Sequence, residues 1–212
     1  MSESQERETS RVEAFSDGVF AIAITLLVLE FKVPHLVAGT ATPPSDRELF
    51  RSLAALWPSL VAFLGSFAAI LIMWINHHGL FRMFHKVDSP FLYANGFLLL
   101  MVTFVPFPTE VLAQYLGHPG ERAAAVFYVG TFVVAGISFN VFWWTAVRRR
   151  LLKSSVSEAH IAKIRSAYRF GLTVYIASTL AALWSAPLGL AMCLSLWIYW
   201  TVLDYRAGGP GS

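Results

Sequence analysis

The chain has 212 residues, of which 56% are hydrophobic and 14% are charged, and its mean hydropathy is +0.58. This composition is too apolar for an ordinary soluble domain. The formal net charge is +3. The basic residues follow the pattern of membrane loops described below, so this charge is not taken to indicate a nucleic-acid partner. The single cysteine, Cys193, excludes an intramolecular disulfide and a multi-cysteine metal site.

Long uncharged stretches predict membrane-spanning helices. Residues 52–76, 89–109 and 123–147 each provide about 21 to 25 residues without a charge, enough to cross a hydrocarbon core about 30 Å thick. Residues 1–10 are polar and lack the basic start and small-residue cleavage site of a secretory signal. We therefore expect an all-α integral membrane protein with a cytoplasmic N-terminal segment at residues 1–10.

The first apolar segment, residues 12–31, is interpreted as a helix because it lacks proline and its apolar residues recur at intervals of three and four. Arg11, Ser16 and Asp17 stand near its start, and a carboxylate at membrane depth is costly unless it is paired or functional. Aliphatic residues at helical spacing usually form core or lipid contacts, and the residues alone favour that role for one face of this helix. That face holds Ile22, Thr25, Leu26 and Leu29.

Three further spans are predicted at residues 53–76, 90–109 and 123–147, with a loop at residues 35–51. The third span of the chain ends at Pro106-Phe107-Pro108, because proline kinks or ends a helix. After the run Arg148-Arg149-Arg150, a polar amphipathic helical segment is expected to continue to Arg169.

The last apolar region, residues 170–203, is too long for one ordinary span. A break at Ser185-Ala186-Pro187-Leu188-Gly189 favours a hairpin of two short spans, and one long kinked helix is the alternative. The hairpin brings the total to six transmembrane helices, with the fifth starting before Phe170.

The distribution of charge predicts the orientation of these spans. Of the sixteen Lys and Arg residues, twelve fall on one side of a six-span arrangement and four on the other. By the positive-inside rule both termini are cytoplasmic. Residues 11–206 then form one transmembrane domain, and residues 207–212 form a flexible tail.

Polar residues inside the spans are candidates for pairing or for transport. Asp17 is interpreted as neutralised by a buried partner, and direct binding of an ion or proton is the alternative. A hydrogen bond from His77 or His78 to Asp17 is the most economical pairing. Asn95 and Asn140 are interpreted as interhelical hydrogen-bonding residues.

Glu30 and Glu110 lie near the predicted outer ends of the first and third spans. Facing an aqueous mouth, they would raise the local cation concentration, and plain solvation at the membrane interface is the alternative. The sequence has no Gly-x-Ser-x-Gly motif, phosphate-binding loop or His-Glu-x-x-His pattern, so no enzyme, cofactor or fixed metal is expected.

The run from Arg11 through Phe15-Ser16-Asp17-Gly18 to Ile22 resembles the signature of the transmembrane protein 175 family of potassium channels, in its prokaryotic form. The pattern Trp74-x-x-His77 and the Pro106-Phe107 pair are similar to the same family. The resemblance implies a potassium-permeable cation channel without a carbonyl selectivity filter. It also implies a multi-pass homotetramer in the plasma membrane, surrounded by lipid, that passes K⁺ and other monovalent cations.

In that family the first helix of each subunit lines a central pore. The resemblance implies a hydrophobic constriction at Ile22, with Leu26 and Leu29 further outward and Thr25 involved in selectivity. It further implies a structural polar network behind the pore helix, made of Arg11, Ser16, Asp17, Trp74 and His77.

Two other functions compete with a channel. A proton-coupled carrier would use Asp17 and His77 as a relay, and would show saturable, pH-driven flux. A membrane-embedded enzyme built on the imidazoles would hold bound metal.

Overall fold

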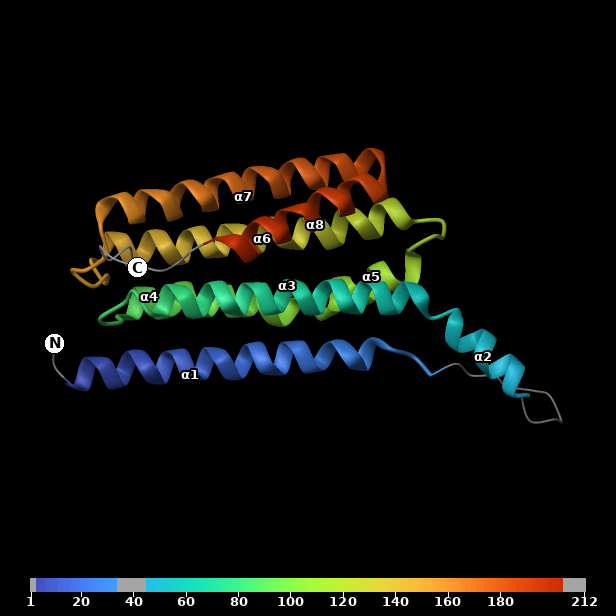
Figure 1. The fold of residues 1–212 in the computed structure, drawn as a ribbon, viewed down its shortest axis with the longest axis horizontal. Helices are drawn as coiled ribbons and strands as arrows, with labels where there is room; N and C mark the ends of the chain where they lie inside the picture. The colour runs from blue at the N-terminus through green and yellow to red at the C-terminus, as the bar shows by residue number, and fades with distance from the viewer. Residues whose placement is uncertain (1–2, 34–44, 204–212) are drawn as a thin grey trace.

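The computed structural model describes residues 3–33 and 45–203, and within these ranges the chain is a helical bundle with one isolated bridge between Phe84 and Leu152 (Figure 1). Its elements in chain order are α1 (Glu3–Leu26), the 3₁₀ helix η1 (Leu27–Glu30), α2 (Asp46–Ala54), α3 (Trp57–Phe81), α4 (Ser89–Phe104), α5 (Pro106–Tyr115), α6 (Glu121–Arg148), α7 (Glu158–Trp184) and α8 (Ala186–Val202).

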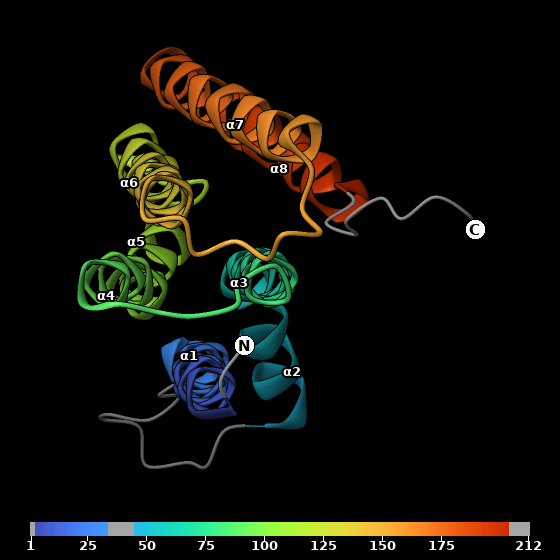
Figure 2. The same cartoon turned by 90° about the vertical axis from the view of Figure 1, so that its left-hand side faces the viewer.

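Helix α1 lies at one edge of the bundle, against α3 and α4, and α7 lies at the opposite edge, as Figures 1 and 2 both show. The helix begins at Glu3, so the polar residues expected to precede the first span form its first turns. This edge position leaves one side of α1 without a neighbouring helix.

The third predicted span is interrupted at the prolines, but it does not end there as expected and continues as α5. Helix α4 ends at Phe104 and α5 begins at Pro106, whose ring cannot donate a backbone hydrogen bond. Pro106 occupies the first turn of α5, where a helix does not need that donor. The two helices together form one kinked segment.

The prediction of a helical hairpin at residues 170–203 is confirmed, and the alternative of one kinked helix is wrong. Helices α7 and α8 pack against each other as antiparallel neighbours (Figure 1). Extended backbone at Ser185 separates them. A Cβ at Gly189 would lie 2.5 Å from Ala182 Cβ, so the close approach requires glycine.

The polar helical segment predicted to run to Arg169 is the start of α7, which begins at Glu158 and passes Arg169 without a break into its apolar part, so the fifth apolar helix starts before Phe170 as predicted. Residues 149–157, between Arg148 and α7, are not helical. The segment 35–51 is not wholly a loop, because α2 begins at Asp46 and protrudes from the bundle (Figure 1).

The start of α2 has a local cause that is readable in the sequence. The Ser45 side chain accepts a hydrogen bond from the Glu48 N–H, and Glu48 Oε2 accepts one from the Ser45 N–H at 2.8 Å. This capping box satisfies two backbone donors at the helix start. Residues 34–44, which hold the rest of the predicted loop, and the predicted tail at 207–212 lie outside the described residues.

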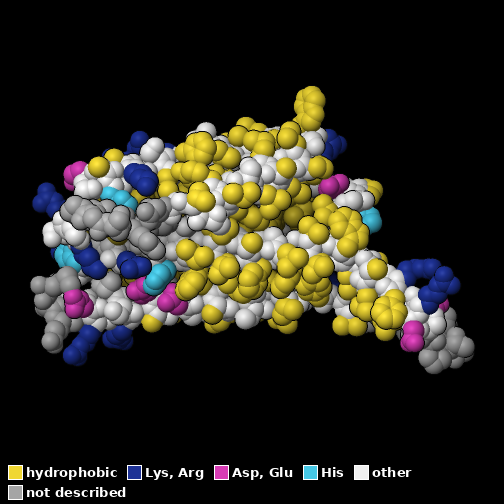
Figure 3. All heavy atoms as spheres, viewed as in Figure 1, with side chains coloured by type: hydrophobic (Ala, Val, Ile, Leu, Met, Phe, Trp, Pro, Cys, Tyr) yellow, Lys and Arg dark blue, Asp and Glu magenta, His cyan; other side chains and the backbone are white. Residues whose placement is uncertain are grey.

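The structure has the surface of a membrane protein. In Figure 3 hydrophobic side chains cover the middle of the bundle, whereas most charged side chains gather towards its two ends. Within the residues that the structure describes, four helical segments are long and apolar enough to cross a membrane, and α8 is a shorter apolar helix. The four segments are 5–30, 57–81, 89–115 and 121–148.

Candidate functional site

Helix α1 and the short helix η1 that continues it have one packed face and one open face. Ser16, Phe20, Ala23 and Leu27 are at most 1% exposed and recur at intervals of three and four, so they form the face against the bundle. The opposite side carries large apolar residues in the open: Phe15 is 67% exposed, Ile22 58% and Leu29 71%. We call this side the open face; it also includes Gly18, Thr25 and Leu26.

The open face has a hydroxyl at its centre. Thr25 Oγ1 donates to the carbonyl oxygen of Ile22 at 2.8 Å. With its hydrogen engaged in that bond, the hydroxyl oxygen keeps its lone pairs for an outside donor or cation. The structure therefore places all four sequence-predicted constriction residues, Ile22, Thr25, Leu26 and Leu29, on the exposed side of the first helix.

A buried chain of hydrogen bonds joins the packed face of α1 to α4 and α3. Ser16 Oγ donates to the Val12 carbonyl at 2.8 Å and accepts from Asn95 Nδ2 at 2.9 Å. Asn95 Oδ1 lies 2.9 Å from His77 Nε2. Because the amide oxygen can only accept, His77 donates from Nε2, and its buried Nδ1 has no partner among the described residues. Asn95 is thus the interhelical residue that the sequence predicted.

The surroundings of His77 are aromatic. Its ring lies between Phe20 of α1, Phe81 of α3 and Phe142 of α6, with centroid distances of 5.3, 4.6 and 5.6 Å. The side chain is completely buried. Such a position holds three helices together and offers no path for an ion.

A second pair of contacts joins α1 to α3 on one flank. Trp74 Nε1 donates to Asp17 Oδ1 at 2.8 Å. The Trp74 ring stacks on His78, whose Nδ1 lies 2.9 Å from Glu13 Oε1. The predicted hydrogen bond from His77 or His78 to Asp17 is wrong, because the side chain of α3 that reaches Asp17 is one turn earlier, at Trp74.

Arg11 does not join these contacts. Its side chain is exposed, and within the described residues it has no hydrogen bond or ion pair. It lines a hollow of about 400 Å³ between α1 and α4, together with Phe15 and Asn95. The structure thus links Ser16 to His77 through Asn95 and joins Asp17 to Trp74, but leaves Arg11 apart.

The two carboxylates predicted at the outer ends do meet. Glu110 of α5 forms an ion pair with Lys32 and accepts from Gln114 Nε2 at 2.8 Å, and Glu30 lies within hydrogen-bonding reach of it. The hydrogen bond and charge of Glu110 raise the pKa of Lys32 above its usual value. The sequence analysis did not name Lys32 as a partner of these carboxylates, although its position two residues after Glu30 places a positive charge beside them.

Within residues 3–33 and 45–203, no three side chains of His, Cys, Asp or Glu lie close enough together to hold a metal ion. Asn140, the other predicted interhelical residue, donates from Nδ2 to the Tyr168 carbonyl of α7 at 3.2 Å, as expected. The polar contacts inside the bundle therefore join helices, and the open face of α1 takes no part in them.

Comparison with known proteins gives consistent matches. The sequence model of a family described as endosomal/lysosomal potassium channel TMEM175 matches residues 11–106. A potassium channel of Chamaesiphon minutus is 47% identical over 200 residues, covering 93% of this chain and 96% of the relative. A potassium channel of Streptomyces collinus is 40% identical over 186 residues, covering 87% of each chain.

The human endosomal/lysosomal proton channel TMEM175 is 30% identical over 141 residues, which are 64% of this chain and 27% of the human protein. Among solved structures, a lysosomal potassium-selective channel TMEM175 homologue from Chamaesiphon minutus superposes with a TM-score of 0.79 at 44% identity. The superposition covers 96% of this chain and 100% of the other.

Proposed function

Because this chain belongs to the TMEM175 family and is a potassium-permeable channel, we propose that the open face of α1 lines its pore and that Ile22 forms the constriction. Its relatives are named as ion channels, and the chain is a channel rather than an enzyme. The observation that supports the pore assignment is the edge position of α1, with an apolar stripe more than half exposed at Ile22 and Leu29.

Four copies of the chain would complete the pore. One α1 supplies a single wall, and a closed ring of identical subunits is the usual way in which soluble and membrane oligomers enclose an axis. The open face carries large apolar side chains, such as Phe15, that a single chain leaves exposed. In the assembled channel, these residues would face the axis or a neighbouring α1.

The constriction would act by dewetting. A ring of isoleucine side chains offers an ion nothing to replace its hydration shell, so a narrow apolar ring blocks ions as well as water. Leu26 and Leu29 would extend the apolar wall outward, and Thr25 would place a hydroxyl oxygen beside it. Opening would then require α1 to tilt or rotate.

The hydrogen bonds behind α1 would set how readily it moves. Ser16 and Asp17 are held by Asn95 and Trp74, and both contacts lie near the middle of α1. The part of the helix beyond Asp17 would therefore move about this anchored point. The competing proton relay has less support, because Asp17 and His77 have different partners and no hydrogen bond joins them.

We further propose that α7 and α8 are the fifth and sixth spans. The protein would then lie in the plasma membrane with both termini in the cytoplasm. In Figure 1 α1 starts at one end of the bundle, and α8 starts at the other end and runs back towards the end where α1 starts. The acidic cluster of Glu30 and Glu110 lies at the opposite end of α1, where it would attract cations to an outer mouth.

The decisive experiment is potassium flux from liposomes that contain the purified protein, for wild type, Ile22→Asn and Ile22→Met. A matched control is Ile176→Asn, since Ile176 is an exposed isoleucine on α7, at the edge of the bundle away from α1. We expect both Ile22 variants to change conduction or selectivity, and the control to behave as wild type.

Three other results would each have a clear meaning. If replacing Ile22 does not change the flux, Ile22 does not form the constriction, although the protein still conducts potassium. Equal effects of Ile22→Asn and Ile176→Asn would point to a general disturbance of the bundle. Folded tetramers without any cation current would contradict the channel itself.

A further inference from the structure

A pocket of about 610 Å³ lies between α6 and α7, at a distance from the open face of α1. Figures 1 and 2 place these two helices on the side of the bundle away from α1, the side that a pore around α1 would turn towards the lipid. The pocket is therefore accessible from the membrane in the proposed assembly, and it plays no part in the pore.

Three arginines surround the pocket: Arg148 at the end of α6, and Arg165 and Arg169 one turn apart on α7. All three are exposed, and no acidic residue lines the pocket with them. Among the described residues, none of these guanidinium groups forms an ion pair. Such a concentration of positive charge favours an anionic ligand.

Tryptophans shape the charged end of the pocket. The Arg148 guanidinium lies 5.0 Å from the centre of the Trp144 ring, a cation–π contact that holds it at the rim. Trp143 also lines the pocket, and its buried indole N–H has no hydrogen-bond partner in the described part of the chain. A buried donor without a partner is costly, and an anionic oxygen would satisfy it.

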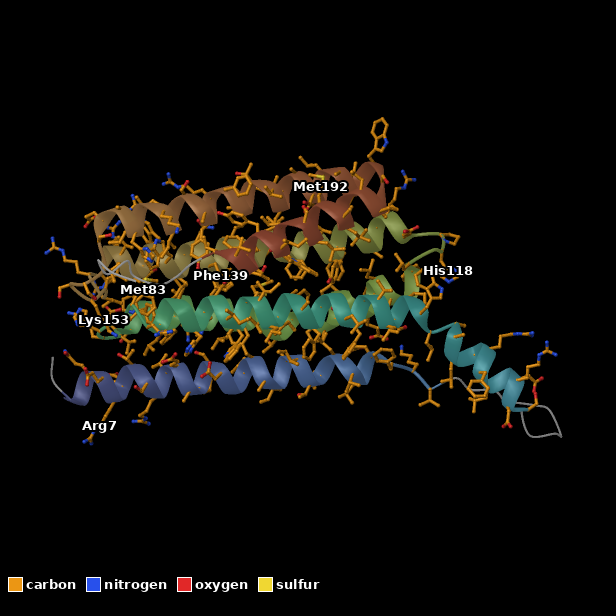
Figure 4. The ribbon with its side chains drawn as sticks, in the orientation of Figure 1. Arg7, Met83, His118, Phe139, Lys153 and Met192 are labelled. Carbon is orange, nitrogen blue, oxygen red and sulfur yellow. The ribbon has the colours of Figure 1, made fainter. Side chains whose placement is uncertain are left out.

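The other wall of the pocket is apolar. Ile137 and Val141 precede Arg148 by two to three turns of α6, and Leu172 follows Arg169 on α7. Both sets of residues lie further from the charged end of the bundle, where Figure 4 labels Lys153 and Arg7. The pocket thus runs from a cationic rim at the end of the bundle to an apolar wall nearer its middle.

This polarity matches a lipid rather than a small anion. We propose that the pocket binds an anionic phospholipid, with its phosphate between Arg148, Arg165 and Arg169 and an acyl chain along Ile137, Val141 and Leu172. Basic pockets between transmembrane helices are a recurrent type of site for such headgroups. The bound lipid would bridge α6 and α7, which form the most extensively packed helix pair of the bundle.

The test measures lipid retained by the full chain in detergent, by native mass spectrometry. Phosphatidylglycerol and phosphatidylcholine with the same acyl chains are added in equal amounts. We expect wild type to retain the anionic lipid preferentially, and the double variant Arg165→Gln/Arg169→Gln to lose about tenfold or more of this preference.

The matched control is Arg47→Gln/Arg51→Gln, which removes the same charge from two exposed arginines one turn apart on α2. This control should retain the lipid as wild type does. An equal loss of phosphatidylglycerol from both double variants would overturn the proposed site, because it would show that the lipid is attracted by positive charge anywhere on the protein. Displacement of phosphatidylglycerol by inorganic phosphate would overturn the lipid as its ligand and indicate a free anion instead.

The variant Leu172→Trp tests the apolar wall without changing any charge. It can be measured even if the double arginine variant does not fold. Leu172 is half-buried, and a larger ring there should fill the path of the acyl chain. Retention of phosphatidylglycerol should fall, while unchanged retention would overturn the placement of the chain. Conduction is not needed for any of these measurements, so they stand apart from the pore assignment.

Discussion

The indole N–H of Trp74 donates a hydrogen bond of 2.8 Å to the carboxylate of Asp17, and this contact ties α3 to the flank of α1. The two residues are 57 positions apart in the chain. Because Asp17 is half-buried and next to the packed face of α1, its carboxylate depends on this donor.

Replacing Trp74 by phenylalanine should destabilise the protein. The substitution keeps an aromatic ring but removes the N–H, and leaving a partly buried carboxylate unpaired costs about 1–3 kcal/mol. Trp184→Phe is the control, because Trp184 is 87% exposed at the end of α7. Thermal unfolding in detergent should show a lower Tm for Trp74→Phe alone. A similar Tm for both variants would contradict the role of the hydrogen bond.

Ser16 and Asn95 should be energetically coupled. Asn95 Nδ2 donates to Ser16 Oγ inside the bundle, and residues in one hydrogen-bond network show interaction energies of about 0.5–3 kcal/mol. A double-mutant cycle with Ser16→Ala and Asn95→Ala, measured by chemical unfolding, gives this energy directly. Strict additivity of the two substitutions would show that the contact contributes nothing.

Glu110→Gln should reduce cation conduction, and more strongly at low salt than at high salt. The carboxylate belongs to the cluster with Glu30 and Lys32 that we propose lies at the outer mouth, and salt screens its attraction for cations. Glu121→Gln is a suitable control, since Glu121 begins α6 outside that cluster. Single-channel conductance over a range of potassium concentrations distinguishes them. Equal conductance of wild type and Glu110→Gln at low salt would remove Glu110 from the mouth.

Asp88→Asn should destabilise the protein at neutral pH but not at acid pH. Asp88 caps α4 by accepting from the Phe91 N–H at 3.1 Å, and it pairs with Arg149 at 2.7 Å. Burial opposes its ionisation, but the bonds from Arg149 and Phe91 outweigh burial and lower the pKa of Asp88. The ionised Asp88 therefore stabilises the folded protein at pH values above the pKa of aspartate in the unfolded chain, about 3.9. This stabilisation is lost as the pH falls through the lower pKa of Asp88 in the folded protein.

The expected cost of Asp88→Asn at pH 7 is up to about 1 kcal/mol, since asparagine keeps the cap and loses only the ion pair. Unfolding in denaturant at pH 7, and again well below pH 4, measures the difference between wild type and variant. The difference should shrink in acid. A constant difference across this range would show that the charge of Asp88 is not its cause.

Much of the architecture was readable in advance because it depends on local chemistry. Pro106 predicted the division between α4 and α5, and Ser185 with Gly189 predicted the hairpin of α7 and α8. The start of α2 was equally local, since Ser45 and Glu48 form a capping box, but the prolines before it favoured a loop. These features depend on a few neighbouring residues and backbone geometry.

The sequence by itself determined that this is a helical membrane protein, which residues of the first helix share a face, and which residues carry the family resemblance. Only the tertiary structure decided which side chains meet. A helical repeat shows that Trp74 and His77 lie about one turn apart, but not that Trp74 reaches Asp17 while His77 turns to Asn95. That choice depends on the rotation of α3 about its axis and on its distance from α1 and α4, which are set by packing across the whole bundle.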